Sequence, residues 1–297
     1  MEKAAAIGTF DGVHRGHAAV LCTLKEAAAM RGLKPVAITF DRHPLSLIAP
    51  ERAPLAITTL EKKEDLLLKA GVTPLVVKFD QKLKDTTASE WMRMMHDEFG
   101  VRHLVVGYDN TFGCDGVNLS IADYRRIGAE NGITVEEAPV VEGISSSAVR
   151  KAIAAGEIEK ANDMLGRRFL LSGIVVEGNQ LGRTIGFPTA NLMPDPGIQI
   201  PGTGVYAATA YLPDGSRHNA VVNIGTRPTV RRGDTLTIEA HIIGWHGNLY
   251  GMPLRIAFQC RLRPEMTFNS IQALREQIEK DTASAQLFLS KSQKQGN

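Results

Sequence analysis

The feature that most constrains this chain is the run at residues 8–17, which reads Gly-Thr-Phe-Asp-Gly-Val-His-Arg-Gly-His. It follows a short apolar segment at residues 4–7 and precedes a stretch whose apolar residues recur with helical spacing. The pattern therefore predicts a buried strand, a glycine-rich turn and a helix in succession. In an open α/β sheet, a turn of this kind at the carboxyl end of a strand is where ligands bind.

The residue types in this run favour phosphate chemistry. Its glycines allow close approach of the backbone to a ligand, and the free N–H groups at the helix start favour an anion. His14 and His17 can donate hydrogen bonds to a phosphate whose charge grows in a transition state, as nucleotidyl transfer requires. Two surface histidines in a helix cap are the simpler alternative, and a metal site would need further ligands, none of which is spaced nearby. We assign catalysis to His14 and His17 and nucleotide binding to Gly8, Phe10, Asp11 and Gly16.

Strand and helix patterns alternate over residues 1–165, which predicts a doubly wound parallel sheet. From Phe169 onward the pattern has period two, and glycine and proline punctuate short strands, which predicts a small antiparallel β-barrel with a terminal helix. The 297 residues suit two domains, placed at residues 1–165 and 166–297. Cys260 is expected in the barrel core, and the final helix is expected to bury Ile271, Leu274 and Ile278. The expected strands are 4–7, 34–40, 74–79, 101–106, 134–138, 205–212, 220–224, 236–242 and 254–262, and the last helix is 269–289.

Composition excludes several classes of function. A net charge of +2 gives no sign of nucleic-acid binding, and no apolar run approaches the ~20 residues of a membrane span. The N-terminal segment does not read as a signal peptide. The three cysteines are far apart and form neither a zinc pattern nor a disulfide framework, so we expect a cytoplasmic protein.

The run at residues 8–17 resembles the nucleotidyltransferases with a His-x-Gly-His signature, and the whole phrase is similar to that of the bacterial bifunctional riboflavin kinase and FAD synthetase family. Two further segments at strand ends take roles from this resemblance. A Phe-x-x-His-Pro segment implies that Asp41 and His43 lie near the flavin and phosphate. In the loop at residues 107–113, the resemblance implies flavin contacts from Asp109 and Asn110, although relatives carry an aromatic residue where this chain has Asn110.

Residues 143–150 read Gly-Ile-Ser-Ser-Ser-Ala-Val-Arg, with three serines at the start of another helical pattern. Serines at a helix start cap it and can bind phosphate, and Arg150 one turn later could reach the same anion. Taken alone, the string favours a serine cap with a solvent-exposed arginine. The family carries a similar phrase that contacts the phosphates of ATP, and the resemblance therefore implies nucleotide binding by Ser145, Ser146 and Ser147 and catalysis by Arg150.

The second functional phrase, at residues 182–191, reads Gly-Arg-Thr-Ile-Gly-Phe-Pro-Thr-Ala-Asn. Its glycines permit close backbone approach, Arg183 supplies a cation, and Thr189 and Asn191 offer oxygen ligands for Mg²⁺. A turn in a β-domain would use the same residue types. The phrase resembles the Pro-Thr-Ala-Asn motif of riboflavin kinases, whose six-stranded barrel binds MgATP by this loop. The nucleotide-binding residues expected here are Gly178, Gly182, Arg183 and Gly186.

Glu239 stands in the middle of a predicted strand, where a carboxylate faces either solvent or a polar pocket. The pattern alone favours solvent. The resemblance implies instead that Glu239 is the base that takes the proton of the terminal ribityl hydroxyl of riboflavin. It also implies flavin contacts from Asn223 and from Arg275 on the last helix.

The resemblance spans residues 4–289 and implies a cytoplasmic bifunctional enzyme. The C-terminal half would make FMN and ADP from ATP and riboflavin, and the N-terminal half would make FAD and diphosphate from ATP and FMN, with Mg²⁺ between the phosphates. Two alternatives stay open: a riboflavin kinase whose nucleotidyltransferase half is silent or serves another acceptor, and a flavin-binding regulator without turnover. The expected partners are small molecules, with no nucleic acid and no membrane, and the chain is expected to be a monomer or weak homo-oligomer.

Overall fold

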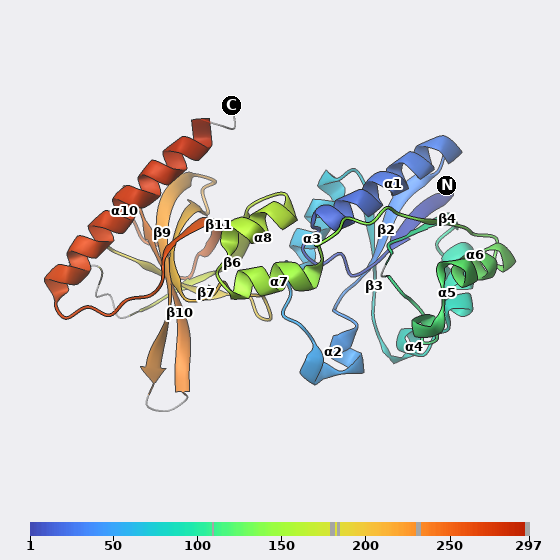
Figure 1. The fold of residues 1–297 in the computed structure, drawn as a ribbon, viewed down its shortest axis with the longest axis horizontal. Coiled ribbons are helices and arrows are strands. Elements are labelled where there is room, and N and C mark those ends of the chain that lie inside the picture. Colours follow the sequence, from blue (N-terminus) through green and yellow to red (C-terminus); the bar gives the residue numbers. More distant parts are fainter. Residues whose placement is uncertain (109, 179–181, 183–184, 230–232, 295–297) are drawn as a thin grey trace. The chain divides into compact units, whose positions relative to one another are not determined.

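The computed structural model describes residues 1–108, 110–178, 182, 185–229 and 233–294 (Figure 1). The chain divides into two compact units, Met1–Ser146 and Ser147–Asn297. The predicted fold class is confirmed, with a parallel sheet covered by helices in the first unit and a closed antiparallel barrel in the second. Within the described residues, none of the helices is both long enough and apolar enough to cross a membrane.

The first unit is built on a five-stranded sheet in the order β3-β2-β1-β4-β5, with all strands parallel. Because the order reverses direction at β1, the turn that follows this strand lies at the topological switch point of the sheet. The strands are β1 Lys3–Ile7, β2 Lys34–Phe40, β3 Thr73–Val77, β4 Val101–Val106 and β5 Thr134–Glu137. The helices are α1 Arg15–Arg31, α2 Leu45–Ile48, α3 Leu60–Lys69, α4 Gln81–Lys84, α5 Ala88–Asp97 and α6 Ile121–Glu130, with short 3₁₀ turns at Pro50–Arg52 and Gly116–Asn118.

Alternate residues of the central strand enter two separate cores, one on each face of the sheet. Ala4 and Ala6 pack with residues of α1 and α3, whereas Ala5 and Ile7 pack with residues of α5 and α6. The apolar face of α5, with Trp91, Met92 and Met95, is part of the second core, and Trp91 is only 2% exposed. Helices therefore cover both faces of the sheet. Their packing holds the strands in place, and with them the loops at the strand ends.

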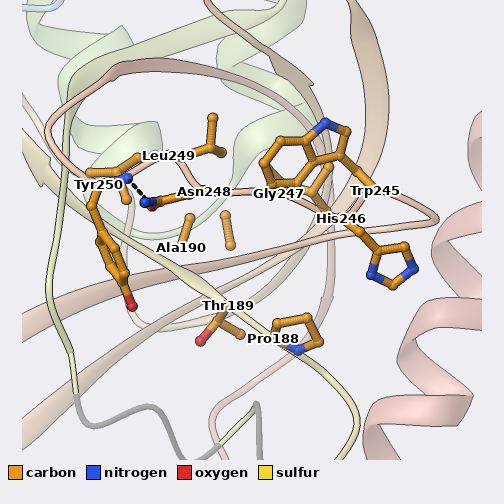
Figure 2. Close-up of a pocket in the computed structure, with 12 residues that line it drawn as sticks. Pro188, Thr189, Ala190, Trp245, His246, Gly247, Asn248, Leu249 and Tyr250 are labelled. Carbon is orange, nitrogen blue, oxygen red and sulfur yellow. Dashed lines mark hydrogen bonds between the residues drawn. The ribbon is translucent and has the colours of Figure 1, made fainter.

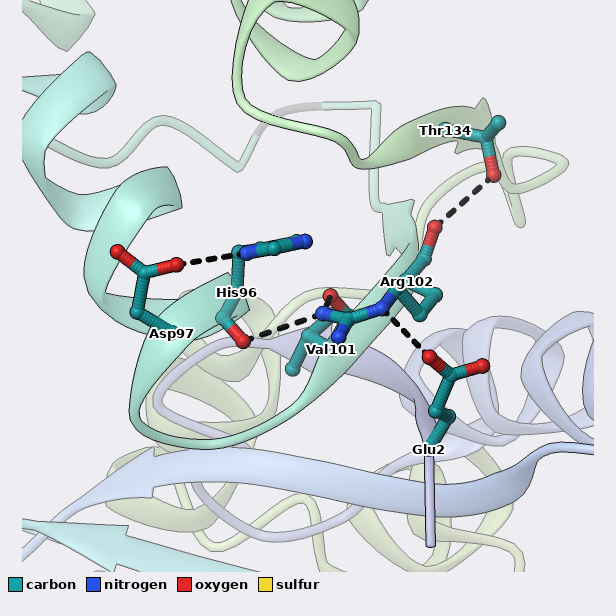
Figure 3. Close-up of polar contacts among 6 residues, drawn as sticks. All are labelled: Glu2, His96, Asp97, Val101, Arg102 and Thr134. Atoms are coloured by element: carbon teal, nitrogen blue, oxygen red, sulfur yellow. Dashed lines mark hydrogen bonds and ion pairs between the residues drawn. The ribbon is translucent and has the colours of Figure 1, made fainter.

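A polar cluster closes the amino edge of this sheet, opposite the edge that carries the turn at residues 8–17 (Figure 3). Arg102 on β4 donates from Nε to Glu2 at 2.8 Å and from Nη1 to the carbonyl oxygen of His96 at 3.2 Å, at the end of α5. Thr134 at the start of β5 donates to the carbonyl oxygen of Arg102 at 3.3 Å. These contacts join β1, β4, β5 and α5 where the strands begin.

The second unit contains a closed six-stranded barrel in the order β10-β7-β6-β11-β8-β9. Its core holds Phe169, Tyr206 and Phe258. Cys260 is buried as predicted, but Ile271 is 62% exposed, so the expectation that it faces the core is wrong. The strands are β6 Phe169–Val176, β7 Ala190–Pro194, β8 Gly204–Tyr211, β9 Arg217–Thr229, β10 Gly233–Ile242 and β11 Pro253–Arg263, and the helices are α7 Ser146–Ala154, α8 Ile158–Leu165 and α10 Ile271–Lys294.

Helices α7 and α8 pack with the barrel, although the sequence analysis places them in the N-terminal half. The buried Asn162 of α8 donates to the carbonyl oxygen of Phe258 at 3.0 Å and accepts from the backbone N–H of Phe169 at 2.6 Å. The backbone N–H of Gly202 donates to the carbonyl oxygen of Ile153 in α7 at 3.0 Å. Strand and helix patterns alternate up to Leu165, so the sequence pattern alone does not show which core these helices bury.

Candidate active sites

The turn between β1 and α1 holds the two histidines face to face. His14 is the N-cap of α1, and its Nδ1 accepts a hydrogen bond from the backbone N–H of His17 at 3.3 Å. The two imidazole rings stack with centroids 3.7 Å apart and planes 15° from parallel, and the buried Phe10 ring meets the edge of His17 at 5.2 Å. A Cβ on Gly16 would come within 3.1 Å of the His14 ring, so a side chain at this position would crowd the pair. The structure therefore brings together the histidines and three of the expected nucleotide-binding residues, Gly8, Phe10 and Gly16.

The same turn is held in an unusual backbone conformation. Phe10 and Val13 have φ values of +46° and +38°, in the left-handed region that costs a β-branched residue most. The carboxylate of Asp11, 7% exposed, accepts from the backbone N–H of Ile57 at 2.9 Å and of Thr58 at 3.3 Å. Asp11, which the sequence analysis assigns to nucleotide binding, thus ties the turn to the segment before α3.

Lys63 on α3 lies beneath this turn and was missed by the sequence analysis. Its Nζ donates to the carbonyl oxygens of Phe40 at 2.9 Å and Thr9 at 3.2 Å, and the residue is 9% exposed. Burial lowers the pKa of Lys63 from its ordinary value, opposed by neighbouring carboxylates, of which Asp11 has the largest effect. The sequence gives no signal that Lys63 is buried. Two other lysines of the same helix, Lys62 and Lys69, pair with Asp65 near the surface, and nothing in the residue pattern distinguishes Lys63 from them.

The three described residues assigned to flavin binding in this unit make contacts with nearby backbone. Asp41 accepts from the backbone N–H of Phe79 at 2.8 Å, which joins the ends of β2 and β3. Nδ1 of His43 accepts from the backbone N–H of Leu45 at 3.2 Å, at the start of α2. Asn110 donates from Nδ2 to the carbonyl oxygen of Ile7, the last residue of β1. All three therefore shape the carboxyl edge of the sheet, while Asp109 lies outside the described residues.

The serine phrase is divided by the limit between the two units. Ser146 begins α7 and donates from Oγ to the carbonyl oxygen of Asp11 at 3.0 Å, so this serine contacts the turn. Ser147 and Arg150 belong to the second unit, and their contact with the phosphates of ATP stays a prediction. Arg150 lies on the same face of α7 as Ser146, because residues four apart on a helix are neighbours.

In the barrel, a row of polar side chains crosses three neighbouring strands. Glu239 on β10 is directly opposite Asn191 on β7 and Asn223 on β9. Residues opposite each other in antiparallel strands share a face, so these three side chains project to the same side of the sheet. Thr189, just before β7, donates from Oγ1 to Oε2 of Glu239 at 3.4 Å. All four residues are half-buried.

Two cavities meet at Thr189. The larger, about 360 Å³, lies between the segment Pro188 to Ala190 and the loop at residues 245–250 (Figure 2). In that loop, the backbone N–H of Tyr250 donates to Oδ1 of Asn248 at 3.0 Å. The second cavity, about 300 Å³, is lined by Glu239 and Asn223 and by apolar side chains that include Leu274 and Ile278 of α10. Thr189 thus stands where contents of the two cavities could react.

The glycines of the barrel phrase make room for its polar groups. A Cβ on Gly178 would overlap the amide of Asn191, with its nitrogen only 2.2 Å away. A Cβ on Gly182 would lie 2.3 Å from the carbonyl oxygen of Phe187, and Gly186 has a φ of +88°. Arg183 lies outside the described residues. The oxygen atoms of Thr189 and Asn191 fit Mg²⁺ chemically, since this hard cation takes oxygen ligands and binds phosphates together with protein side chains.

Two family descriptions match this chain. The riboflavin kinase family model matches residues 165–289, and the FAD synthetase family model matches residues 1–150. The chain belongs to the bifunctional riboflavin kinase/FMN adenylyltransferase family. Helix α8 falls between the two matched regions.

Relatives named bifunctional riboflavin kinase/FMN adenylyltransferase cover both halves. Those from Pseudomonas fluorescens and Escherichia coli K12 are each 37% identical, over 95% of this chain and 91% of the relative. One from Bacillus subtilis is 36% identical, over 96% and 92%. A crystal structure described as a macrolide-efflux protein from Streptococcus pneumoniae has a TM-score of 0.86 and 27% identity, covering 96% of this chain and 94% of that one. The whole two-part architecture is thus shared.

The flavin contact expected from Arg275 on α10 stays a prediction. Arg275 pairs with Glu279 at 3.2 Å on the exposed side of α10, and the structure does not bring it into the Glu239 cavity. The cavity is lined instead by Arg263 of β11 and the buried Asp281 of α10, whose side chains join at 2.8 Å and 3.1 Å. The sequence gives no signal that Asp281 is buried, because an aspartate in an amphipathic helix is expected to face solvent.

Proposed function

We propose that this protein makes FMN and then FAD. The barrel transfers the γ-phosphoryl group of ATP to riboflavin, giving FMN and ADP. The first unit transfers AMP from a second ATP to FMN, giving FAD and diphosphate. The observation that carries the proposal is the polar row of Asn191, Glu239 and Asn223, with Thr189 between two cavities, in a chain of this family.

In the kinase step, riboflavin occupies the cavity that holds Glu239, whose apolar walls suit a flavin ring. ATP occupies the cavity beside the loop at residues 245–250. The ribityl hydroxyl oxygen forms a bond to the γ-phosphorus, the bond from that phosphorus to the leaving ADP oxygen breaks, and Glu239 takes the hydroxyl proton. Asn223 orients the flavin. Thr189 and Asn191 would hold Mg²⁺, which supplies positive charge to the phosphates when bound.

In the adenylyl step, an FMN phosphate oxygen attacks the α-phosphorus of ATP and diphosphate leaves, so no proton transfer and no covalent enzyme intermediate is needed. His14 and His17 donate hydrogen bonds to the phosphate as its charge grows, at the start of α1 where the helix dipole favours an anion. Gly8, Phe10, Gly16 and the serines at residues 145–147 shape the nucleotide site. We retain Arg150, Asp41, His43 and Asp109 as residues expected to contact phosphate or flavin by family resemblance.

The remaining expectations follow from this chemistry. The partners are ATP, riboflavin and FMN, with no nucleic acid, and the protein acts in the cytoplasm, where these substrates occur, as a monomer or weak homo-oligomer. The activities divide between residues 1–165 and 166–297. Because FMN is the product of one site and the substrate of the other, it must leave the barrel before it is adenylylated.

The deciding experiment follows flavins by chromatography after riboflavin is mixed with the protein, excess ATP and Mg²⁺. FMN should appear first and FAD later, and both steps should stop when a chelator removes Mg²⁺. FMN alone, even at long times, would favour a nucleotidyltransferase half that is silent or serves another acceptor. Bound riboflavin with no product and no ATP consumption would overturn the proposal in favour of a flavin-binding regulator.

A further inference from the structure

Lys63 is a buried cation whose position is fixed by main-chain oxygens. Its Nζ binds the carbonyl oxygen of Thr9, which also accepts from Oγ1 of the buried Thr39 at 3.1 Å. It also binds the carbonyl oxygen of Phe40, the last residue of β2. A buried ammonium is costly unless it is fully hydrogen-bonded, so its presence at this place needs a reason.

The backbone beside this cation is strained. The positive φ values of Phe10 and Val13 persist only if surrounding contacts over-determine the turn. Lys63 of α3 holds the residue before Phe10, and Asp11 binds backbone N–H groups of the segment just before α3. The backbone N–H of Gly12 also donates to Oγ1 of Thr58 at 3.3 Å. Lys63 contributes a positive charge to these anchors.

We propose that Lys63 is a positioning residue for adenylyl transfer: by holding the carbonyl oxygens of Thr9 and Phe40, it fixes the turn that carries His14 and His17. The proposal rests on the proposed function of the first unit. Lys63 reaches the reaction only through the backbone of the turn.

The geometry gives Lys63 two effects on the same turn. The first is mechanical, because the ammonium joins the ends of β1 and β2 and sets the direction in which the chain leaves β1 toward His14. The second is electrostatic. Carbonyl oxygens carry partial negative charge, and at the edge of the sheet where phosphate is to bind, the ammonium offsets the charge of the two oxygens it contacts.

The test compares K63M with the native protein and with K62M as a matched control. Methionine keeps the length of the lysine stem but removes the ammonium. Lys62 is the next residue of the same helix, and its Nζ pairs with Asp65 at 2.6 Å near the surface. FMN adenylylation and riboflavin phosphorylation are measured separately, each with kcat and KM for ATP, and folding is followed by circular dichroism.

We expect K63M to lower kcat for FAD formation by about a hundredfold while KM for ATP changes less than about threefold, because misplacement of the turn acts on the transition state. Riboflavin phosphorylation should stay at the native rate in K63M, and both activities should stay native in K62M. A folded K63M with native kcat for FAD formation would overturn the proposal, as would a loss confined to KM.

A second variant covers the case in which K63M does not fold. K63Q keeps amide N–H donors without the charge, and its kcat for FAD formation should fall below that of the native protein by less than about a hundredfold. Folded K63Q with the native kcat would overturn the proposal. If the native protein itself made no FAD, the proposed function of the first unit would fail, which is a different outcome from a native enzyme that is insensitive to Lys63.

Discussion

Glu239 occupies the middle of the polar row that crosses β7, β10 and β9. In E239Q the amide has nearly the same shape but cannot take the proton of the riboflavin hydroxyl. We expect kcat for riboflavin phosphorylation to fall by about 10²- to 10⁴-fold, the range for loss of a general base. Formation of FAD from added FMN should be unchanged, because it takes place in the other unit. An equal loss of both activities would instead indicate a folding defect.

Cys260 provides a prediction about pH. Burial raises the pKa of its thiol from 9.0 to about 11, so the folded protein keeps the proton to a higher pH than the unfolded chain does. The free energy of unfolding should therefore fall as pH rises from about 9 to 11, by at most about 3 kcal/mol from this group. Urea unfolding of the native protein and C260A at pH 8 and pH 10.5 checks this: the fall should be smaller in C260A, and parallel curves would contradict it.

At the scale of single residues, the sequence identified chemistry better than it identified contacts. Thr189, Asn191 and Glu239 are predicted from short phrases. In the structure, Thr189 donates to Glu239, and Asn191 lies directly opposite Glu239 on the neighbouring strand. The contact of Asp11 with the nucleotide stays a prediction, and its carboxylate also binds the backbone N–H group of Ile57, 46 residues away in the chain. Such partners could not be predicted, because a long-range hydrogen bond to main chain leaves no residue pattern.

Helix α10 forms one wall of the Glu239 cavity, and its buried Asp281 pairs with Arg263 of β11 there. In D281N, the guanidinium of Arg263 would lose its charged partner in a site where the two side chains are only 16% and 7% exposed. We expect the free energy of unfolding to fall by about 3 kcal/mol and KM for riboflavin to rise, with FAD formation from FMN unaffected. Urea unfolding and steady-state kinetics measure both quantities.

The matched control for α10 is E279Q, which removes the partner of Arg275 on the exposed side of the same helix. Exposed ion pairs contribute little, so the change in unfolding free energy should stay within about 0.5 kcal/mol. A larger loss in E279Q than in D281N would contradict the expectation that the buried pair stabilises the protein more than the exposed one.

Elements with strong periodicity were predicted well. The strands expected at residues 34–40 and 101–106 begin and end as β2 and β4 do. β7 was not foreseen, because the Thr189 to Asn191 phrase reads as a functional loop. Its strand character arises from pairing with β6 and β10, which are distant in sequence. The expectation for Ile271 is wrong because α10 begins to line the Glu239 cavity only at Leu274. Ile271, one turn earlier, is exposed.

For the whole molecule, the limit between the units has a consequence for stability. The family models leave residues 151–164 unmatched, and α8 occupies the second half of this stretch. Ile158 and Ala161 of this helix are fully buried, and α8 packs against β6 and β11 of the barrel. The segment that links the two activities in sequence is therefore part of the barrel's own hydrophobic core.

Two fragments test this directly. A fragment of residues 147–297 retains α8, whereas one of residues 166–297 loses it and exposes the barrel surface that Ile158, Met164 and Leu165 cover. It also leaves the backbone N–H of Phe169 without its Asn162 partner. We expect the shorter fragment to be less stable by at least about 4 kcal/mol, from the burial of these side chains and the lost hydrogen bonds. Urea unfolding followed by circular dichroism measures the difference. Equal stability of the two fragments would mean that α8 only links the two halves, and the functional limit at residue 165 would then also be the structural one.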